Sequence, residues 1–386
     1  MEDIDDYIEY DEMMQCTKQN NAGGYEIIRG AVGVQTTDSR LYYRTYLPAS
    51  IQQVDEQQFL TKEWGDRLNS IYREIGKMEG LGFYETNFKV RNRQFFRQES
   101  VAVLRKEDVE VHLTEVFSLR LSADICKKMV IYEYMEEQRD CICGNVLKGK
   151  IKISNKDAAL RQNQIWESTE FKKEGVLVYS PPSPEHIPEL MRDLEGFWNE
   201  KTKMDIFIKA GLMAYQFLTI MPYEENNEIW LSVLLNYYLK LQGIEIDYYI
   251  PYAKYLIEQD VERKRAMRQV RESGDYGKWI RFFLDVLEMA VTKTNQAIMQ
   301  LEQIHKNTLA SIENEKQKSL LQEVSAFMEE NPVFVIHDIE REFHTAYNTA
   351  AKSVAILEKH DLVKEISNKQ RYRVYCYEQY LKEIIK

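Results

Sequence analysis

The chain contains few cysteines, no long apolar run and no excess of positive charge. Its five cysteines are an odd number in 386 residues, and no two have the C-x-x-C spacing of a zinc or redox motif. Cys141 and Cys143 supply two of the four ligands that a structural zinc ion needs, and no other cysteine or histidine lies close to them in sequence. Because free thiols are typical of a reducing compartment, we expect a cytoplasmic protein.

The sequence also lacks the features of a membrane protein and of a general binder of polyanions. No stretch approaches the roughly 18 apolar residues of a membrane-spanning helix. The first residues, MEDIDDYIEYDEMM, lack the basic start and apolar run of a signal peptide. A net charge of −11 argues against general binding of polyanions, although it is compatible with a local basic strip. We therefore expect no membrane partner.

The residues that are present predict a mainly α protein. Hydrophobic residues make up 44% and charged residues 29% of the chain, the normal balance of a globular protein with a sizeable core. From about residue 56 the apolar residues recur at helical spacing, whereas β-branched residues and glycines in 144–180 predict a small β-hairpin. We divide the chain into an N-terminal helical region with an acidic tail (1–110), a core (111–316) and a C-terminal domain (317–386).

Two neighbouring segments are apolar on all sides. Residues 204–220 and 229–243 are almost wholly apolar, which is typical of the central helices of a bundle. The polar loop between them has two rigid supports, so a functional site can be built there. A longer helix, 278–316, carries a heptad-like apolar stripe. Packing within its own chain is the first interpretation of this stripe, and a homodimer is the alternative.

The last 70 residues have the element order of a winged helix. A first helix leads into Pro332, a second covers about 337–343, and a third runs from about 347 to 360. The end, LVKEISNKQRYRVYCY, is typical of a strand, a polar turn and a second strand. We therefore expect a C-terminal winged helix-turn-helix domain.

Several segments, taken in order, resemble the Fic/DOC (Fido) family. The loop between the apolar helices reads IMPYEENNEIW, where the family signature is HPFxxGNGRxxR. The similarity extends to YYRTYLPAS, to Arg161 with QIWES, to VYSPPSPEHIPELMRDLEGFWN and to RESGDYGKWIRFFLD. The resemblance implies a Fic-type helical bundle with a β-hairpin flap and an appended winged helix. It also implies the chemistry of a protein adenylyltransferase, which moves AMP from ATP to a protein hydroxyl.

The signature departs from the family pattern at most of its chemical positions. Met221 stands where the family has its catalytic His, and a thioether cannot take a proton from a hydroxyl. Asn226 and Glu228 replace the two glycines whose turn presents backbone N–H groups to phosphates. Ile229 and Ser232 replace two arginines, and neither can supply a charged bidentate fork.

Three interpretations of this loop follow. In the first, the loop caps its own helix, with Asn226 or Asn227 as the N-cap and Glu224, Glu225 and Glu228 near the positive helix end. In the second, a nucleotide still binds through Glu225, Asn226, Asn227 and Glu228, and Glu225 holds Mg²⁺. In the third, AMP transfer continues with a substitute base such as Glu224. We favour the first and expect no cofactor; ATP and Mg²⁺ are the ligands expected in the other two.

The resemblance also suggests an inhibitory helix, for which the family pattern is [S/T]xxxE[G/N]. The segment RQESVAVLRKEDV aligns best and puts Glu107 at the inhibitory glutamate, with Val103 and Asp108 at its neighbours. Its usual arginine partner is missing, since Ser232 stands in that place. The alternative interpretation of Glu107 is an ordinary surface glutamate.

The C-terminal domain offers a surface for DNA. The residues that could reach bases or phosphates lie in its third helix and its strand–turn–strand: Asn348, Thr349, Lys352, Lys369, Arg371 and Arg373. Residues 318–386 contain 10 Lys and Arg but 11 Asp and Glu, so the domain is not strongly basic. Docking of a protein is the alternative role.

The sequence thus predicts a Fic-like pseudoenzyme that acts as a binding scaffold or regulator for an unidentified protein partner. One alternative is a nucleotide-binding AMP transferase with altered chemistry. The other is a DNA-binding transcriptional regulator that acts through the winged helix.

Overall fold

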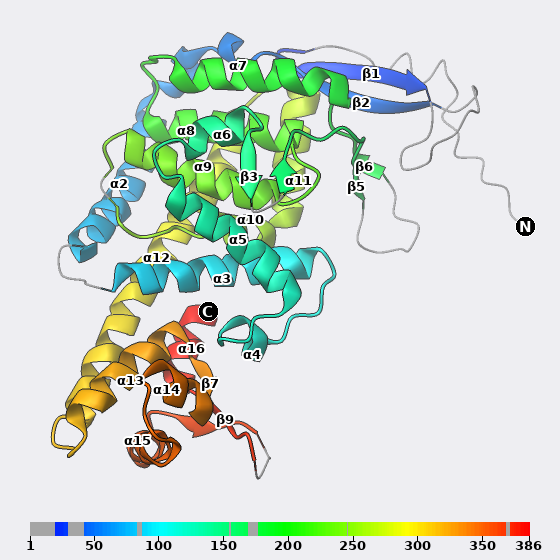
Figure 1. Ribbon diagram of the computed structural model, residues 1–386. Helices are drawn as coiled ribbons and strands as arrows, with labels where there is room; N and C mark the ends of the chain where they lie inside the picture. Colours follow the sequence, from blue (N-terminus) through cyan, green and yellow to red (C-terminus); the bar gives the residue numbers. More distant parts are fainter. Residues whose placement is uncertain are drawn as a thin grey trace, which may run out of the picture. The chain divides into compact units, whose positions relative to one another are not determined.

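The computed structural model in Figure 1 describes residues 20–29, 42–82, 87–153, 156–168, 177–244, 246–367 and 371–386. It is mainly helical, which confirms the fold class predicted from the sequence. None of the described helices is long and apolar enough to cross a membrane.

The chain forms two compact units, each assembled from separate segments. The first unit contains Met1–Asn69, Gln138–Gln242 and Gln259–Val286, and the second contains Ser70–Glu137, Gly243–Glu258 and Leu287–Lys386. Two long helices, α2 (Lys62–Gly82) and α12 (Gly277–Ser311), contribute residues to both units. The sequence analysis divided the chain into three consecutive domains, whereas each of these two units combines separate segments. The three-domain division stays a prediction.

Helices α8 (Ile206–Ile220) and α9 (Asn227–Leu241) form the core of the first unit, as their apolar sequences predict. Asp205 begins α8 by accepting a hydrogen bond from the backbone N–H of Phe207 at 2.8 Å, the usual role of an aspartate N-cap. The neighbouring short elements are η1 (Ile51–Gln53), η2 (Glu56–Phe59), α6 (Ile142–Leu147), η3 (Pro184–His186), α7 (Ile187–Asn199) and α11 (Asp260–Ser273). Helices α6, α7, α8 and α9 lie side by side (Figure 1).

The described strands of the first unit form antiparallel pairs. They are β1 (Gly23–Arg29) with β2 (Tyr42–Pro48), β3 (Ile151–Ile153) with β4 (Lys156–Ala158), and β5 (Glu167–Ser168) with β6 (Leu177–Tyr179). The single hairpin expected in 144–180 is therefore two strand pairs, and its first residues belong to helix α6. Strand β1 begins at Gly23, within the N-terminal region for which the sequence predicted helices and an acidic tail. A Cβ at Gly23 would lie 2.3 Å from the carbonyl oxygen of Leu47, and its φ is 140°, so glycine is required.

The second unit is a set of helices with a small sheet. Its elements are α3 (Phe88–Lys106), α4 (Leu113–Val116), α5 (Ala123–Glu137), α10 (Tyr252–Glu258), α13 (Lys318–Glu330), β7 (Val333–Val335), α14 (Ile336–Glu342), α15 (Tyr347–Lys359), β8 (Lys364–Glu365), β9 (Val374–Cys376) and α16 (Glu378–Ile385). Buried polar side chains of α3 bind the ends of other helices. Gln94 donates to the carbonyls of Glu329 and Glu330 at 2.7 and 2.8 Å. These carbonyls end α13 and have no partner within that helix.

The C-terminal elements follow the order expected from the sequence. Strand β9 lies between β7 and β8 in an antiparallel sheet, with Cys376 opposite both Val333 and Lys364. Helices α13, α14 and α15 occupy the three helical segments predicted for this region.

The apolar stripe of α12 is buried. Its members are Ile280, Leu284, Leu287, Val291, Ile298 and Leu301, and each is at most 2% exposed. This burial agrees with packing of the stripe within its own chain. The homodimer stays a prediction.

Candidate functional site

The loop between α8 and α9 turns sharply at both ends. Met221 follows α8 with φ of 46°, and Asn226 precedes α9 with φ of 63°, so both adopt the left-handed conformation. Asparagine tolerates this conformation, whereas it is uncommon for methionine. The N-cap of α9 is Asn226, one of the two positions expected from the sequence, but its side chain makes no capping hydrogen bond.

Asn227 closes the loop from inside. Its Oδ1 accepts a hydrogen bond from the backbone N–H of Tyr223 at 3.0 Å, and its Nδ2 donates to the Tyr223 carbonyl at 2.7 Å. The Tyr223 hydroxyl donates to the carbonyl of Val146 in α6, and its ring contacts Phe217 and Trp230. The side chains of Asn227 and Tyr223 therefore hold the loop in this conformation.

Arg161 supports the loop from the other side. This residue is 1% exposed, and its backbone N–H donates to the Pro222 carbonyl at 2.9 Å. Its guanidinium donates to four main-chain carbonyls, those of Met221, Asn163, Pro182 and Ile220. Burial lowers the pKa of Arg161 to about 10, so the group stays charged at neutral pH.

Two carboxylates of the loop point to solvent. Glu224 is exposed, and its Oε1 accepts a hydrogen bond from Asn163 Nδ2 at 2.6 Å. Glu225, the predicted Mg²⁺ ligand, is also exposed. It is absent from the group of three metal-ligating side chains found among the described residues.

Glu228 differs from these two because it is buried. It lies in the first turn of α9, is 8% exposed, and its charge acts on Arg263 of α11. Arg263 is 2% exposed and donates to Glu167 at 2.7 Å and to Asp260 at 2.6 Å. Burial alone would lower the pKa of Arg263, but the carboxylates of Glu167, Asp260 and Glu228 outweigh it and raise that pKa above its ordinary value.

This charged cluster already carries an excess of negative charge. Three carboxylates, from Glu167, Asp260 and Glu228, surround Arg263, and Lys264 pairs with Asp260 at 2.6 Å. A further anion would add to the excess of one negative charge. The cluster also joins strand β5 of the expected flap to helices α9 and α11.

The remaining signature positions face the protein interior. Ile229 and Ser232, which stand for the family's arginines, are both 0% exposed. Both side chains are therefore inaccessible to a phosphate that approaches from solvent.

Glu107, the expected inhibitory glutamate, follows the last residue of α3 as its C-cap. Both of its carboxylate oxygens accept hydrogen bonds from Lys128 Nζ at 2.9 Å, and the Lys128 side chain is 6% exposed. The inhibitory role of Glu107 stays a prediction, but this carboxylate has a lysine partner within the second unit.

Most of the expected DNA-binding residues are accessible. Asn348 and Lys352 on α15 are exposed, Thr349 is half-buried, and Arg371 and Arg373 before β9 are exposed. Lys369 lies outside the described residues. Asn348, Thr349 and Lys352 lie on α15 as expected, and DNA binding itself stays a prediction.

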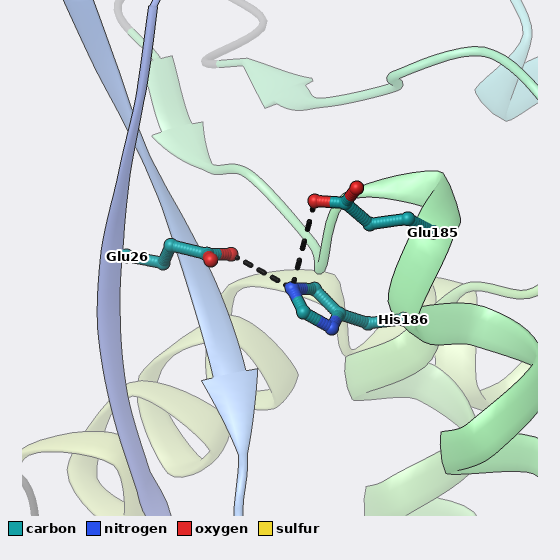
Figure 2. A group of neighbouring side chains, drawn as sticks. All are labelled: Glu26, Glu185 and His186. Carbon is teal, nitrogen blue, oxygen red and sulfur yellow. Dashed lines mark hydrogen bonds and ion pairs between the residues drawn. The ribbon is translucent and has the colours of Figure 1, made fainter.

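A group of three side chains elsewhere in the first unit could hold a cation (Figure 2). His186 Nε2 lies 3.0 Å from Glu26 Oε2 and 3.9 Å from Glu185 Oε1. The three potential ligand atoms lie within 4.8 Å of one another. This group could not be predicted from the sequence, because Glu26 is distant in sequence from Glu185 and His186. Both carboxylates face the same ring nitrogen, an arrangement that a hydrogen bond and an ion pair explain without a metal.

Sequence reasoning also missed Arg263. The segment DVERKRAMRQVRES is rich in charge and is typical of a solvated helix. One signal was present: Arg263 shares a helical face with Met267 and Val270, four and seven residues later, and both are buried.

One family model matches part of the chain that includes this site. Residues 147–239 match the model of the Fic/DOC family, and this segment contains Arg161, Glu167 and the α8–α9 loop. The chain is also similar to the crystal structure of a Fic family protein from Desulfovibrio desulfuricans G20. That similarity has 15% identity and a TM-score of 0.46, and it covers 80% of this chain and 95% of the other. The family match confirms the resemblance for residues 147–239.

Proposed function

We propose that this protein is a Fic-like protein without AMP transfer, and that it acts as a binding scaffold or regulator. The observation that carries the proposal is the burial of Glu228 beside Arg263, where the family signature has a glycine. A glycine there lets the backbone approach a phosphate, whereas Glu228 brings a carboxylate that is already used in an internal charge cluster.

The loop also lacks a suitable base. Met221 stands for the signature His, and its sulfur is a very weak hydrogen-bond acceptor. Glu224, the substitute base, is exposed and bonded to Asn163. A general base must hold the substrate hydroxyl within hydrogen-bond reach, whereas the carboxylate of Glu224 is directed to Asn163. We therefore assign Glu224 no catalytic role.

ATP with Mg²⁺ does not fit the residues present. A phosphate at the start of α9 would add a negative charge near the helix turn that contains Glu228. Two like charges brought to about 4 Å would repel by about 4 kcal/mol at an effective dielectric constant near 20. Glu225 would offer Mg²⁺ one exposed carboxylate, and the other ligands would be phosphate oxygens and waters, so the ion depends on a phosphate that Glu228 disfavours. We derive no catalytic step through a bound nucleotide.

Labelled ATP tests the proposal directly. The full-length protein is incubated with ATP labelled at the α-phosphate and Mg²⁺, alone and with cell lysate, beside an active Fic enzyme. We expect no covalent label on the protein or on lysate proteins, and no heat of ATP binding by calorimetry. Covalent AMP would overturn the proposal. Binding that Glu225→Ala abolishes would support the transferase with altered chemistry instead.

DNA binding through residues 318–386 is a second candidate function. It is supported by the order of α13, β7, α14, α15, β8 and β9, which is that of a winged helix, and by the exposure of Asn348, Lys352 and Arg371. A gel shift at low salt, weakened by Arg371→Ala with Arg373→Ala, would support this function. The absence of any shift at low salt would count against it.

A further inference from the structure

A groove runs along helix α15 in the second unit. It has a volume of about 530 Å³ and is lined by α15, by the segment that leads into β9 and by the junction of β7 with α14. Tyr347, Ala351, Ala355 and Glu358 lie on one face of α15, because they are separated by four, four and three residues. The two alanines lie in the middle of this face and leave space for a side chain from another molecule.

Accessible aromatic rings form the walls of the groove. Tyr347 is 44% exposed and Tyr372 is 73% exposed. The His337 ring lies near both, with ring centres 5.1 Å from Tyr347 and 6.0 Å from Tyr372. Tyr372 also has φ of 56°, a conformation that is rare and strained for an aromatic residue. Clustered large side chains that remain exposed mark a surface for binding.

The rim of the groove is positively charged on one side. Arg371 is exposed, and none of the ion pairs among the described residues includes it. Arg373 forms a weak pair, with its Nη1 3.5 Å from Glu365 Oε2 and its side chain 51% exposed. Glu358 also lines the groove, and its charge acts on Arg373. The accessible cation at this site is thus Arg371.

We propose that this groove binds an acidic segment of a partner protein. An aromatic or large aliphatic side chain of the segment lies over Ala351 and Ala355, and a carboxylate next to it pairs with Arg371. Tyrosine and arginine are among the residues that contribute most to protein–protein binding energy, and the groove presents both. The site does not involve residues 147–239, so it is independent of the loss of AMP transfer.

The charge distribution favours a protein segment over a nucleic acid. Glu358 lines the groove and Glu365 lies beside Arg373, so a chain of regularly spaced phosphates would meet carboxylates as well as arginines. Residues 318–386 carry 11 acidic and 10 basic side chains, unlike a strongly basic nucleic-acid-binding domain.

Selection from a random peptide library tests this site. A phage library of random 12-residue peptides is selected on the immobilised full-length protein, and the enriched peptides are measured by fluorescence polarisation. We expect enriched sequences with Asp or Glu beside Tyr, Phe, Trp or Leu. Ala355→Trp, which fills the groove from an exposed position, should weaken their binding at least about tenfold, the equivalent of about 1.4 kcal/mol. Arg371→Glu should weaken it by a similar factor.

Lys382→Trp is the matched control, because Lys382 is exposed on α16 and does not line the groove. This variant should bind the peptides within about twofold of the original protein. Circular dichroism and the thermal midpoint establish that each variant is folded. The proposal is overturned if no peptide is enriched, if the enriched peptides bind Ala355→Trp unchanged, or if oligonucleotides bind in the groove and acidic peptides do not.

Discussion

The side chain of Asn227 bonds both main-chain polar groups of Tyr223, accepting from its N–H at 3.0 Å and donating to its carbonyl at 2.7 Å. Asn227 is one of the few signature positions that agree with the Fic pattern. In this chain its amide holds the α8–α9 loop closed through these two bonds. Asn227 therefore supports the loop as a structural element.

Asn227→Ala should destabilise the protein by about 1–3 kcal/mol, because it leaves the buried N–H and carbonyl of Tyr223 without these partners. Urea unfolding, followed by circular dichroism, measures the change. Glu225→Ala is the matched control in the same loop, since Glu225 is exposed, and should change stability by less than about 0.5 kcal/mol. Equal effects of the two variants would contradict the structural role of Asn227.

Arg263→Met should be more damaging, at about 3–5 kcal/mol, because it leaves Glu167, Asp260 and Glu228 without their shared cation. Adding Glu228→Gln should recover part of that loss, by about 0.5–3 kcal/mol, because one of the uncompensated charges is removed. Urea unfolding of the two single variants and the double variant gives this coupling.

The control for this cycle is Arg268→Met on the same helix. The Arg268 side chain is 73% exposed and pairs with Glu272, so its loss should cost less than about 0.5 kcal/mol. Purely additive effects of Arg263→Met and Glu228→Gln would show that the two charges do not interact.

Met221→His should not restore AMP transfer. The variant regains the residue type of the base, but Glu228 still lies at the start of α9 and Ile229 and Ser232 still face the interior. Transfer of labelled AMP, measured beside an active Fic enzyme, should remain at background. Label on the Met221→His protein would mean that the missing base was the sole defect.

His305 should make stability depend on pH. Its Nδ1 contacts the buried carboxylate of Glu329 at 2.5 Å, and this hydrogen bond raises the pKa of His305 above its ordinary value of 6.5. Below that value His305 is protonated in the folded and unfolded chains, and the stabilisation is fully present. As the pH rises, the unfolded chain loses its proton first, so the stabilisation declines until the folded His305 also loses its proton.

Urea unfolding at about pH 5.5 and about pH 8.5 measures this effect. The free-energy difference between the original protein and His305→Gln should be larger at the lower pH. His112→Gln is the control, because the His112 side chain is 62% exposed and lies 3.8 Å from the exposed Glu110. A difference that grows toward high pH would contradict the assignment.

Much of the frame could be predicted because strong local patterns determine it. Residues of α8 and α9 are apolar on every face, and such segments have few alternatives to central helices. The elements after residue 317 were also predictable, since Pro332 and the polar turn before β9 mark their limits.

The predictions failed where contacts between distant segments decide the structure. The N-terminal region was expected to contain helices and an acidic tail, but β1 begins at Gly23 because β2 supplies a partner strand. The electrostatic effect of Glu228 on Arg263, 35 positions apart, has no local pattern in the sequence. The burial of Glu228 in the first turn of α9 was not predictable for the same reason, since helix starts usually place such carboxylates in solvent.

Arg161 has a consequence for how such a chain changes during evolution. Every side-chain bond of Arg161 ends on a main-chain oxygen, and main-chain oxygens are present whichever residue stands at positions 163, 182, 220 and 221. Replacement of a catalytic side chain at position 221 therefore removes none of these bonds. Selection for catalysis acts on side-chain atoms of this loop, whereas selection for folding acts on its main-chain oxygens. Selection for catalysis can therefore be relaxed while selection for folding is maintained.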